Sequence, residues 1–277
     1  MELLAFVPLH CHSVFSFHAG VCTVRELVSR AKKLGVRALA LTDTDRMSGL
    51  VQFYLECRRQ HLKPILGVEI TTPARPEEYV VLLARNAKGY GDLCEIVTRR
   101  QLDPSSFNLG ETFAQPWPDL LLLTASPDLL QVLYRSPNRA RLFAEIVHNS
   151  PSTRARGREL ERSADVLGVP LVASNNSFFL EPADREIHRT LRAIGLNATV
   201  SRLREEELQP VDAYLKSAGE MERAFADRPE LVGDSRSERS TVPAPPAGEL
   251  PGISYPITRT DALFHERHMD RPRFDFL

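Results

Sequence analysis

The stretch FVPLHCH, residues 6–12, is an apolar run that ends in two histidines one residue apart. Successive side chains on a β-strand point to opposite faces, so His10 and His12 share one face while Cys11 faces away from them, toward the core. Neutral imidazole is the commonest metal ligand in proteins. The spacing therefore indicates a metal pair or a phosphate clamp; the alternative is a strand that carries two polar groups near its end.

Three further apolar runs also end at polar residues. The runs cover residues 37–42, 64–68 and 170–174, and the residues that follow them are Asp43, Glu69, and Asn175 with Asn176. In α/β barrels the carboxyl ends of the parallel strands meet on one rim, where sites are found. A single carboxylate at a strand end usually caps the following loop. Four polar strand ends, one of them the histidine pair, instead predict a site on that rim.

The composition is that of an ordinary soluble globular protein, because 43% of the 277 residues are hydrophobic and 26% are charged. This length suits one large α/β domain or two modest ones. The formal net charge of -1 offers nucleic acid no global attraction. Contact with DNA would therefore have to be local or supplied by another domain.

Cysteine usage and hydropathy predict a cytoplasmic protein. The start of the chain lacks a basic region followed by a long apolar core, so no secretory signal is predicted. No run approaches the ~18 apolar residues that a membrane span needs. The cysteines have no CxxC spacing and are interpreted as scattered reduced thiols. They are Cys11, Cys22, Cys57 and Cys94.

Strand and helix patterns alternate along the chain and predict a parallel sheet that is closed, or nearly closed, into a barrel over residues 1–234. Capping-box pairs, Thr23 with Glu26 and Ser217 with Glu220, predict two helix starts. Residues 235–277 are rich in proline without apolar periodicity, and are predicted to be a linker or disordered tail. Further strands are expected at 79–84, 120–124 and 142–148, and further helices at 23–34, 47–60, 90–98, 156–167 and 187–194.

Six segments in order along the chain carry a family resemblance. They are LHCHS (9–13), LTD (41–43), GVE (67–69), VLLARNAKGY (81–90), AYLKS (213–217) and FADRPE (225–230). Over residues 5–240 the chain resembles the PHP (polymerase and histidinol phosphatase) domain at the N-terminus of the bacterial DNA polymerase III alpha subunit and its error-prone relatives. The resemblance implies a distorted (β/α)7 barrel of the TIM-like kind, placed ahead of a polymerase palm, fingers and thumb.

The resemblance also implies metal ligands, because active members of the family build a trinuclear site from histidines and carboxylates. Carried over position by position, the matching residues are His10, His12, Asp43, Glu69 and, in a looser register, His148. These five residues are the candidate metal site.

Several expected ligands are replaced in this chain. Thr44 stands where the family has a histidine, Asn176 where it has an aspartate, and Phe178 where it has another histidine. Ala19, beside His18, occupies the place of an aspartate in the first loop. An amide is a weak neutral ligand and a phenyl ring cannot bind metal. The expected cofactor is therefore none, or one weakly bound divalent ion such as zinc, manganese or magnesium.

The preferred hypothesis is a catalytically silent PHP domain of a DNA polymerase III alpha-type protein. The resemblance implies that such a protein takes part in DNA replication or translesion synthesis. It would serve as a platform for the polymerase body or as a docking surface for other replisome or translesion proteins, with only indirect contact to DNA and none to membranes. The chain ends at Leu277, before the family's palm would begin, and the unfamiliar stretch 257–277 suggests a truncated or split reading frame.

Two alternatives remain open. The first is an active metal-dependent phosphoesterase, either a 3′-5′ exonuclease or a small-molecule phosphatase, in which bound metal would activate water. The second is an unrelated, metal-free binding barrel, which explains the periodicity but not the ordered polymerase-like segments.

Two helical segments carry groups of arginines. Arg154, Arg156 and Arg158 could contact phosphate, but the nearby Glu159 and Glu161 favour a solvated helix face.

In the second segment, Ile187, Leu191 and Ile194 align on one face before Gly195. His188 lies among Arg185, Arg189 and Arg192 and is interpreted as solvated surface.

Overall fold

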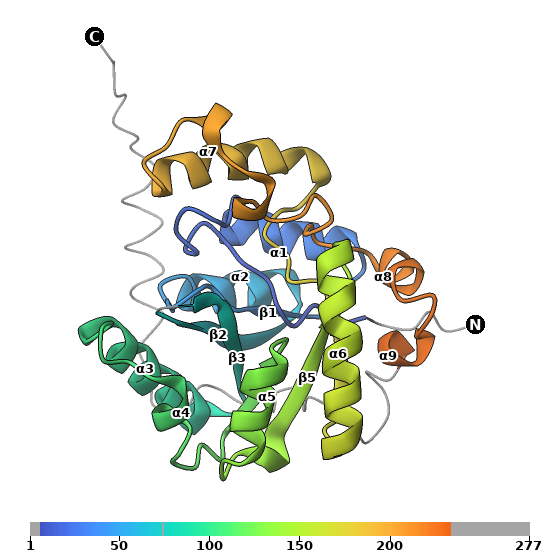
Figure 1. Cartoon of the computed structure of the whole chain (residues 1–277). Helices are drawn as coiled ribbons and strands as arrows, with labels where there is room; N and C mark the ends of the chain where they lie inside the picture. Colours follow the sequence, from blue (N-terminus) through green and yellow to red (C-terminus); the bar gives the residue numbers. More distant parts are fainter. Residues whose placement is uncertain (1–5, 74, 234–277) are drawn as a thin grey trace. The chain divides into compact units, whose positions relative to one another are not determined.

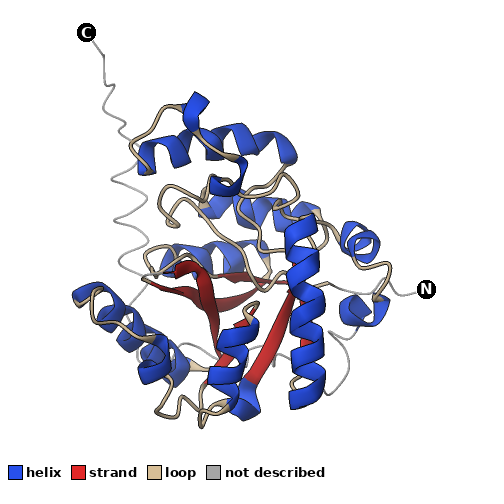
Figure 2. Cartoon of the chain, in the orientation of Figure 1, coloured by secondary structure: helices blue, strands red, loops and turns tan. Residues whose placement is uncertain are grey.

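A single curled sheet of six strands runs through the computed structural model, which describes residues 6–73 and 75–233 (Figures 1 and 2). The strands follow one another in the sheet in the order in which they occur in the chain. They are β1 (Ala38–Leu41), β2 (Lys63–Thr72), β3 (Arg75–Ala84), β4 (Leu120–Thr124), β5 (Leu142–Val147) and β6 (Leu171–Ser174). The tail predicted for residues 235–277 lies outside the described residues.

The sheet is mixed rather than wholly parallel, which corrects the sequence-based expectation. β3 runs antiparallel to both of its neighbours, β2 and β4, whereas all other strand pairs are parallel. Only residues 73 and 74 separate β2 from β3. A connection this short can form a hairpin but cannot make the crossover of a dozen or more residues that a parallel pair requires.

The segment that carries the two histidines joins the two ends of the sheet. On one side, the carbonyls of Pro8 and Cys11 accept backbone hydrogen bonds of 2.9 Å from Ala40 of β1 and from Thr42, the residue after β1. On the other side, His12 N–H donates to the carbonyl of Ser177 (2.8 Å), and Ser177 N–H donates to the carbonyl of His10 (3.0 Å). Pairing here is limited to these bonds and an isolated bridge between Cys11 and Ser177, so the predicted first strand is not a regular strand. The segment nevertheless continues the curl of the sheet between β1 and the chain after β6.

Helices cover the convex side of the sheet (Figure 2). The six predicted helices are confirmed, with α3 and α6 longer than predicted, and the Thr23 and Ser217 capping boxes are both formed. The α-helices of the described residues are α1 (Val24–Lys33), α2 (Leu50–Gln60), α3 (Ala87–Leu102), α4 (Leu109–Thr112), α5 (Pro127–Tyr134), α6 (Pro151–Leu167), α7 (Arg185–Gly195), α8 (Ala218–Ala224) and α9 (Pro229–Gly233). Within residues 6–73 and 75–233, none of them combines the length and apolarity that a bilayer crossing demands.

Alternation along the strands divides the core into two layers. On β3, Val80 and Leu82 pack into the larger cluster beneath the helices, whereas Val81 and Leu83 pack into a smaller cluster with Leu9 inside the curl. Successive side chains of a strand point to opposite faces, so one strand supplies both layers. Polar side chains that face into the curl are therefore brought close to one another.

Helix α7 is turned opposite to the usual arrangement of an amphipathic helix. Ile187 and Ile194 are 54% and 63% exposed, whereas His188 is fully buried. The interpretation of His188 as solvated surface is therefore wrong. Arg185 and Arg192 lie on the inner side, where their Nε groups donate to the carbonyls of residues 209 and 207.

The buried His188 connects three segments of the chain. Its Nδ1 lies 2.7 Å from the carbonyl oxygen of Ala19, and its Nε2 accepts a 3.0 Å hydrogen bond from Gln209 N–H. The ring also lies near Phe178 and Phe179. Hydrogen bonding at both nitrogens explains how an imidazole is accommodated in the interior.

Candidate metal centre

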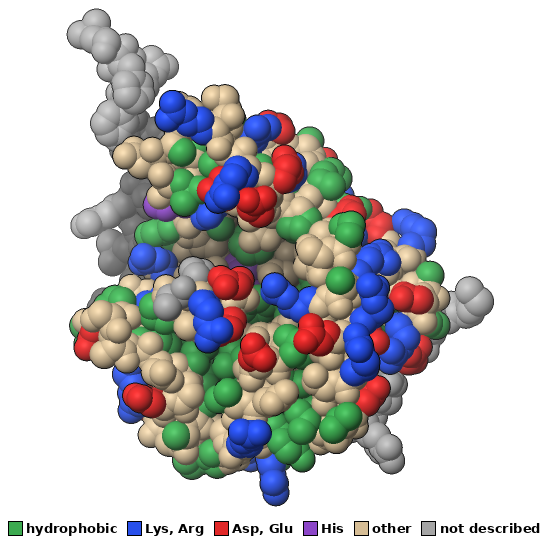
Figure 3. Space-filling view, viewed as in Figure 1, with side chains coloured by type: hydrophobic (Ala, Val, Ile, Leu, Met, Phe, Trp, Pro, Cys, Tyr) green, Lys and Arg blue, Asp and Glu red, His purple; other side chains and the backbone are tan. Residues whose placement is uncertain are grey.

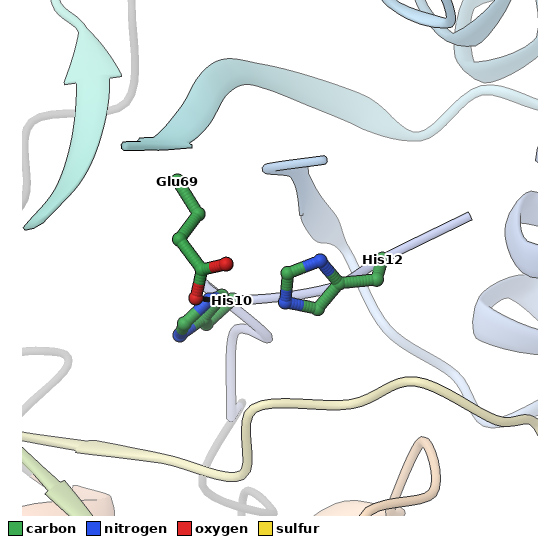
Figure 4. A group of neighbouring side chains, drawn as sticks. All are labelled: His10, His12 and Glu69. Carbon is green, nitrogen blue, oxygen red and sulfur yellow. Dashed lines mark hydrogen bonds and ion pairs between the residues drawn. The ribbon is translucent and has the colours of Figure 1, made fainter. Parts of the chain in front are cut away.

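Three side chains inside the curl offer ligand atoms that lie within 4.8 Å of one another: His10, His12 and Glu69 (Figure 4). The histidines come from the segment that joins the sheet ends, and Glu69 comes from β2. All three side chains are buried. Among the residues that the structure describes, this is the one group of three His, Cys, Asp or Glu side chains close enough to share an ion.

His10 lies between two carboxylates. Its Nε2 is 3.1 Å from Oε2 of Glu69, and its Nδ1 is 2.8 Å from Oε1 of Glu145. The hydroxyl of Tyr79 donates to the other oxygen of Glu145 over 3.0 Å. Neither Glu145 nor Tyr79 was among the site residues predicted from the sequence. A carboxylate inside the apolar strand 142–147 was the sequence feature that could have indicated Glu145.

His12 is held on both edges and on one face. Its Nδ1 is 2.9 Å from the hydroxyl of Ser16, and its Nε2 is 3.0 Å from Oδ1 of Asn176. The Phe178 ring stacks on the imidazole with centroids 3.9 Å apart and planes 8° from parallel. Phe178 thus covers His12 with an apolar face that cannot bind metal.

The cluster divides its charges unevenly. Burial by itself would lower the pKa of His10, but the carboxylate of Glu145, aided by that of Glu69, outweighs it and raises that pKa to about 10. Burial lowers the pKa of His12 to about 4. Burial would raise the pKa of both glutamates, yet their contacts with His10 hold each pKa below its ordinary value. One imidazolium therefore lies between two carboxylates, beside a neutral imidazole.

Asp43 is buried next to this group, but its oxygens are used by the first loop. It accepts hydrogen bonds from the backbone N–H of Ser13 (2.7 Å), the hydroxyl of Ser13 (2.8 Å) and the hydroxyl of Ser16 (2.7 Å). Burial raises the pKa of this carboxyl despite these hydrogen bonds. Since Ser16 also contacts His12, Asp43 is linked to the group through one intervening hydroxyl.

Thr44 is hydrogen-bonded to Glu69. Its hydroxyl donates to Oε1 of Glu69 over 2.8 Å, so both oxygens of this carboxylate have a partner.

The structure places His148 apart from the other candidate residues. Its Nδ1 lies 3.2 Å from the carbonyl oxygen of Ala224, and its ring stacks on Phe225 with centroids 4.2 Å apart. On β5, Ile146 belongs to the cluster beneath the helices. Alternation along the strand explains why Glu145 faces into the curl while His148 packs on the helix side.

The donor set fits one divalent ion. Two imidazoles and a carboxylate are ligands that zinc and related metals accept. Metal-bound histidines commonly donate their second ring N–H to a carboxylate, and the contact between His10 Nδ1 and Glu145 has this form. His10 Nε2, His12 and Glu69 are thus the groups that would hold an ion, with Glu145 orienting His10.

Residues 8–135 match the family described as the PHP domain. This chain carries a PHP domain. The PHP chain is 28% identical over 253 residues to DNA polymerase III subunit alpha from Pseudomonas fluorescens, an alignment that covers 82% of this chain and 22% of the relative. It is 33% identical over 227 residues to an error-prone DNA polymerase from Pseudomonas syringae, with 75% and 22% covered. The chain therefore spans less than a quarter of these relatives.

The PHP chain also resembles solved structures. One is a two-domain protein from Bacteroides vulgatus whose description names a PHP-like metal-dependent phosphoesterase. The likeness has a TM-score of 0.38 at 14% identity, and covers 63% of this chain and 52% of that chain.

Proposed function

We propose that this PHP barrel is a non-catalytic structural domain of a DNA polymerase III alpha-type protein. The relatives that support the proposal are an alpha subunit and an error-prone polymerase, and both align with the PHP chain over at least three quarters of its length. In this proposal the barrel supports the polymerase body, or docks other replisome or translesion proteins, and takes no part in phosphodiester chemistry.

One observation carries the proposal: the polar groups of the candidate centre are hydrogen-bonded to one another and to neighbouring side chains. His10 contacts two carboxylates, Glu69 is bound at both oxygens, and three donors from the first loop surround Asp43. Phe178 covers the face of His12. Buried polar groups that are fully hydrogen-bonded rigidify a core, whereas a phosphoesterase needs open positions for substrate and water. The arrangement therefore suits a polar core that fixes the closure of the barrel.

The second candidate is a single-metal phosphoesterase, and the convergence of His10, His12 and Glu69 favours it. A bound metal would lower the pKa of a coordinated water and offset charge on the phosphate. The chain would hold the ion through these three side chains, and Glu145 would keep the His10 ring oriented.

Metal content and hydrolysis, measured on one preparation, separate the two candidates. The purified chain is exchanged into metal-free buffer, analysed by plasma mass spectrometry, and assayed with bis(p-nitrophenyl) phosphate and added Mn²⁺ or Zn²⁺. We expect substoichiometric metal, and the same background hydrolysis for wild type and His12→Ala.

The control variants change equivalent residues on the surface. His61→Asn and Glu186→Gln alter exposed positions, whereas His12→Ala and Glu69→Gln alter the candidate centre. Stoichiometric metal and turnover that survive in the surface variants but disappear in both centre variants would overturn the structural proposal and establish the phosphoesterase.

A further inference from the structure

Helix α6 presents a row of three arginines, Arg154, Arg158 and Arg162, which we name the arginine row. All three are exposed and lie at intervals of four residues, so they fall along one side of the helix. With a rise of 1.5 Å per residue, successive members are about 6 Å apart along the helix axis. The row therefore extends over roughly 12 Å of surface.

The arginine row has no internal counter-charge. Within the residues that the structure describes, no carboxylate lies within 4 Å of any of the three guanidinium groups. Several other described arginines do form ion pairs. Arg59 pairs with Glu56 and Arg99 with Glu95, each inside its own helix. The three charges of the row are thus available to a partner.

Neither glutamate next to the row on α6 forms an ion pair with it in the described residues. Glu161 is bound by Arg228, 2.8 Å away, and Glu159 lines a pocket together with Arg75 and Arg156. The sequence alone favoured a solvated face because these glutamates are close in the chain. In the structure they do not neutralise the row.

The row begins at the first turn of α6, next to the chain leaving β5. Arg154 is near enough to His148 that its charge, after burial, helps to lower the pKa of that imidazole. His148 contacts the carbonyl of Ala224, and the neighbouring Arg223 is exposed on α8. Figure 3 shows Lys and Arg side chains gathered over α6 and α8.

We propose that the arginine row binds the phosphate backbone of a nucleic acid. The planar guanidinium matches phosphate oxygens through paired N–H donors, and regularly spaced arginines can engage successive phosphates. Helix α6 contains no aromatic residue on which a base could stack. The contact is therefore electrostatic and independent of nucleotide sequence. It concerns the outer surface of α6 and does not depend on whether the candidate centre holds a metal.

The test is a binding titration of the whole chain with a fluorescein-labelled 20-nucleotide oligothymidylate, followed by fluorescence anisotropy. EDTA is present throughout, so the result does not depend on phosphoesterase activity. The triple variant Arg154→Gln, Arg158→Gln, Arg162→Gln is compared with a charge-matched control. The control variant replaces Arg58, Arg139 and Arg202 by glutamine; these arginines are exposed and have no carboxylate within 4 Å in the described structure.

Each phosphate contact to a single strand contributes about -0.7 to the slope of log K against log salt concentration. We expect the slope of the row variant to be shallower than that of wild type by about 2, and its affinity at 100 mM salt to be at least tenfold lower. The affinity of the control should stay within about twofold of wild type.

Equal losses in the row variant and the control would show a general charge effect and overturn the assignment. The same holds for wild-type protein that does not bind. Competition by poly-glutamate as strong as that by unlabelled oligothymidylate of equal charge would assign the row to an acidic protein segment instead. Circular dichroism melts confirm that all variants are folded.

Discussion

The inside of the barrel rim and the outside of α7 both reverse the common distribution of polar and apolar residues, but in different ways. The inner cluster of His10, His12, Glu69 and Glu145 places polar side chains where apolar ones are usual, whereas α7 exposes Ile187 and Ile194. The inner cluster is compensated, because each ring nitrogen and each glutamate has a partner. Ile187 and Ile194 of α7, by contrast, stay largely exposed in the described structure.

The burial of a polar group thus depends on its partners more than on its position in the sequence. Charged side chains are accommodated inside the curl because side chains of opposite charge from distant segments of the chain pair there. On α7 the inner side is decided by hydrogen bonds of Arg185, His188 and Arg192 to backbone groups of other segments. Ile187 and Ile194 are then left exposed, while Leu191 is half-buried. Disrupting the inner cluster should therefore lower the free energy of unfolding far more than changing the exposed face of α7.

The largest effect is expected from Glu145→Ala. The substitution removes the partner of the buried His10 Nδ1 and the acceptor of the half-buried Tyr79 hydroxyl. Breaking a buried charged pair costs about 3–5 kcal/mol of unfolding free energy. Urea unfolding measures the loss, with the exposed Glu186→Ala expected to stay within about 0.5 kcal/mol. A loss below about 1 kcal/mol for Glu145→Ala would contradict the described network.

A smaller effect concerns pH. Burial, together with the nearby Arg192 and Arg185, lowers the pKa of His188 in the folded protein, although the contact with the Ala19 carbonyl acts in the opposite direction. In the unfolded chain a histidine titrates near a pKa of about 6.5. Below that pH the unfolded state binds a proton that the folded state does not yet bind, so stability falls as pH falls, by at most about 1.4 kcal/mol per pH unit.

The variant His188→Gln isolates this contribution, because glutamine keeps a donor and an acceptor but does not titrate. Unfolding free energies are measured between pH 7.5 and pH 5. We expect wild type to lose on the order of 1 kcal/mol more than the variant over this range. The same pH dependence in both proteins would show that His188 is not the group responsible.

The smallest effect is expected on the outer face of α7. Ile194→Glu changes a side chain that is 63% exposed, so the unfolding free energy should stay within about 0.5 kcal/mol of wild type. Val166→Glu on α6, where the valine is 86% exposed, is a matched control on another helix. A loss above about 1.5 kcal/mol for Ile194→Glu alone would mean that this face is covered in solution.

The two glutamates of the inner cluster show how far sequence patterns reach. Glu69 was identified because it follows the short apolar run 64–68, although β2 continues to Thr72. Glu145 was overlooked because it lies in the middle of the apolar strand 142–147, where no strand end marks it. Both face into the curl, and their common partner His10 is 135 residues away from Glu145 in the chain.

Alternation on β5 also explains the position of His148. The family resemblance predicted that His148 is a metal ligand. In the structure, Ile146 packs on the helix side of the sheet, and His148, two residues later, lies on the same side. One residue of register reverses the face on which a side chain lies. The resemblance could therefore indicate the strand but not the orientation of this residue.

The local features of this protein could be read from its sequence: the helix starts at Thr23 and Ser217, the apolar strands, and the two histidines that face the same way from one short segment. These features depend on contacts among residues a few positions apart. Three features became visible only in the folded chain: β3 returns as a hairpin, Glu145 contacts His10, and α7 turns Arg185 and Arg192 inward. Such outcomes depend on which distant segments the curl of the sheet brings together, and local periodicity does not encode those distances.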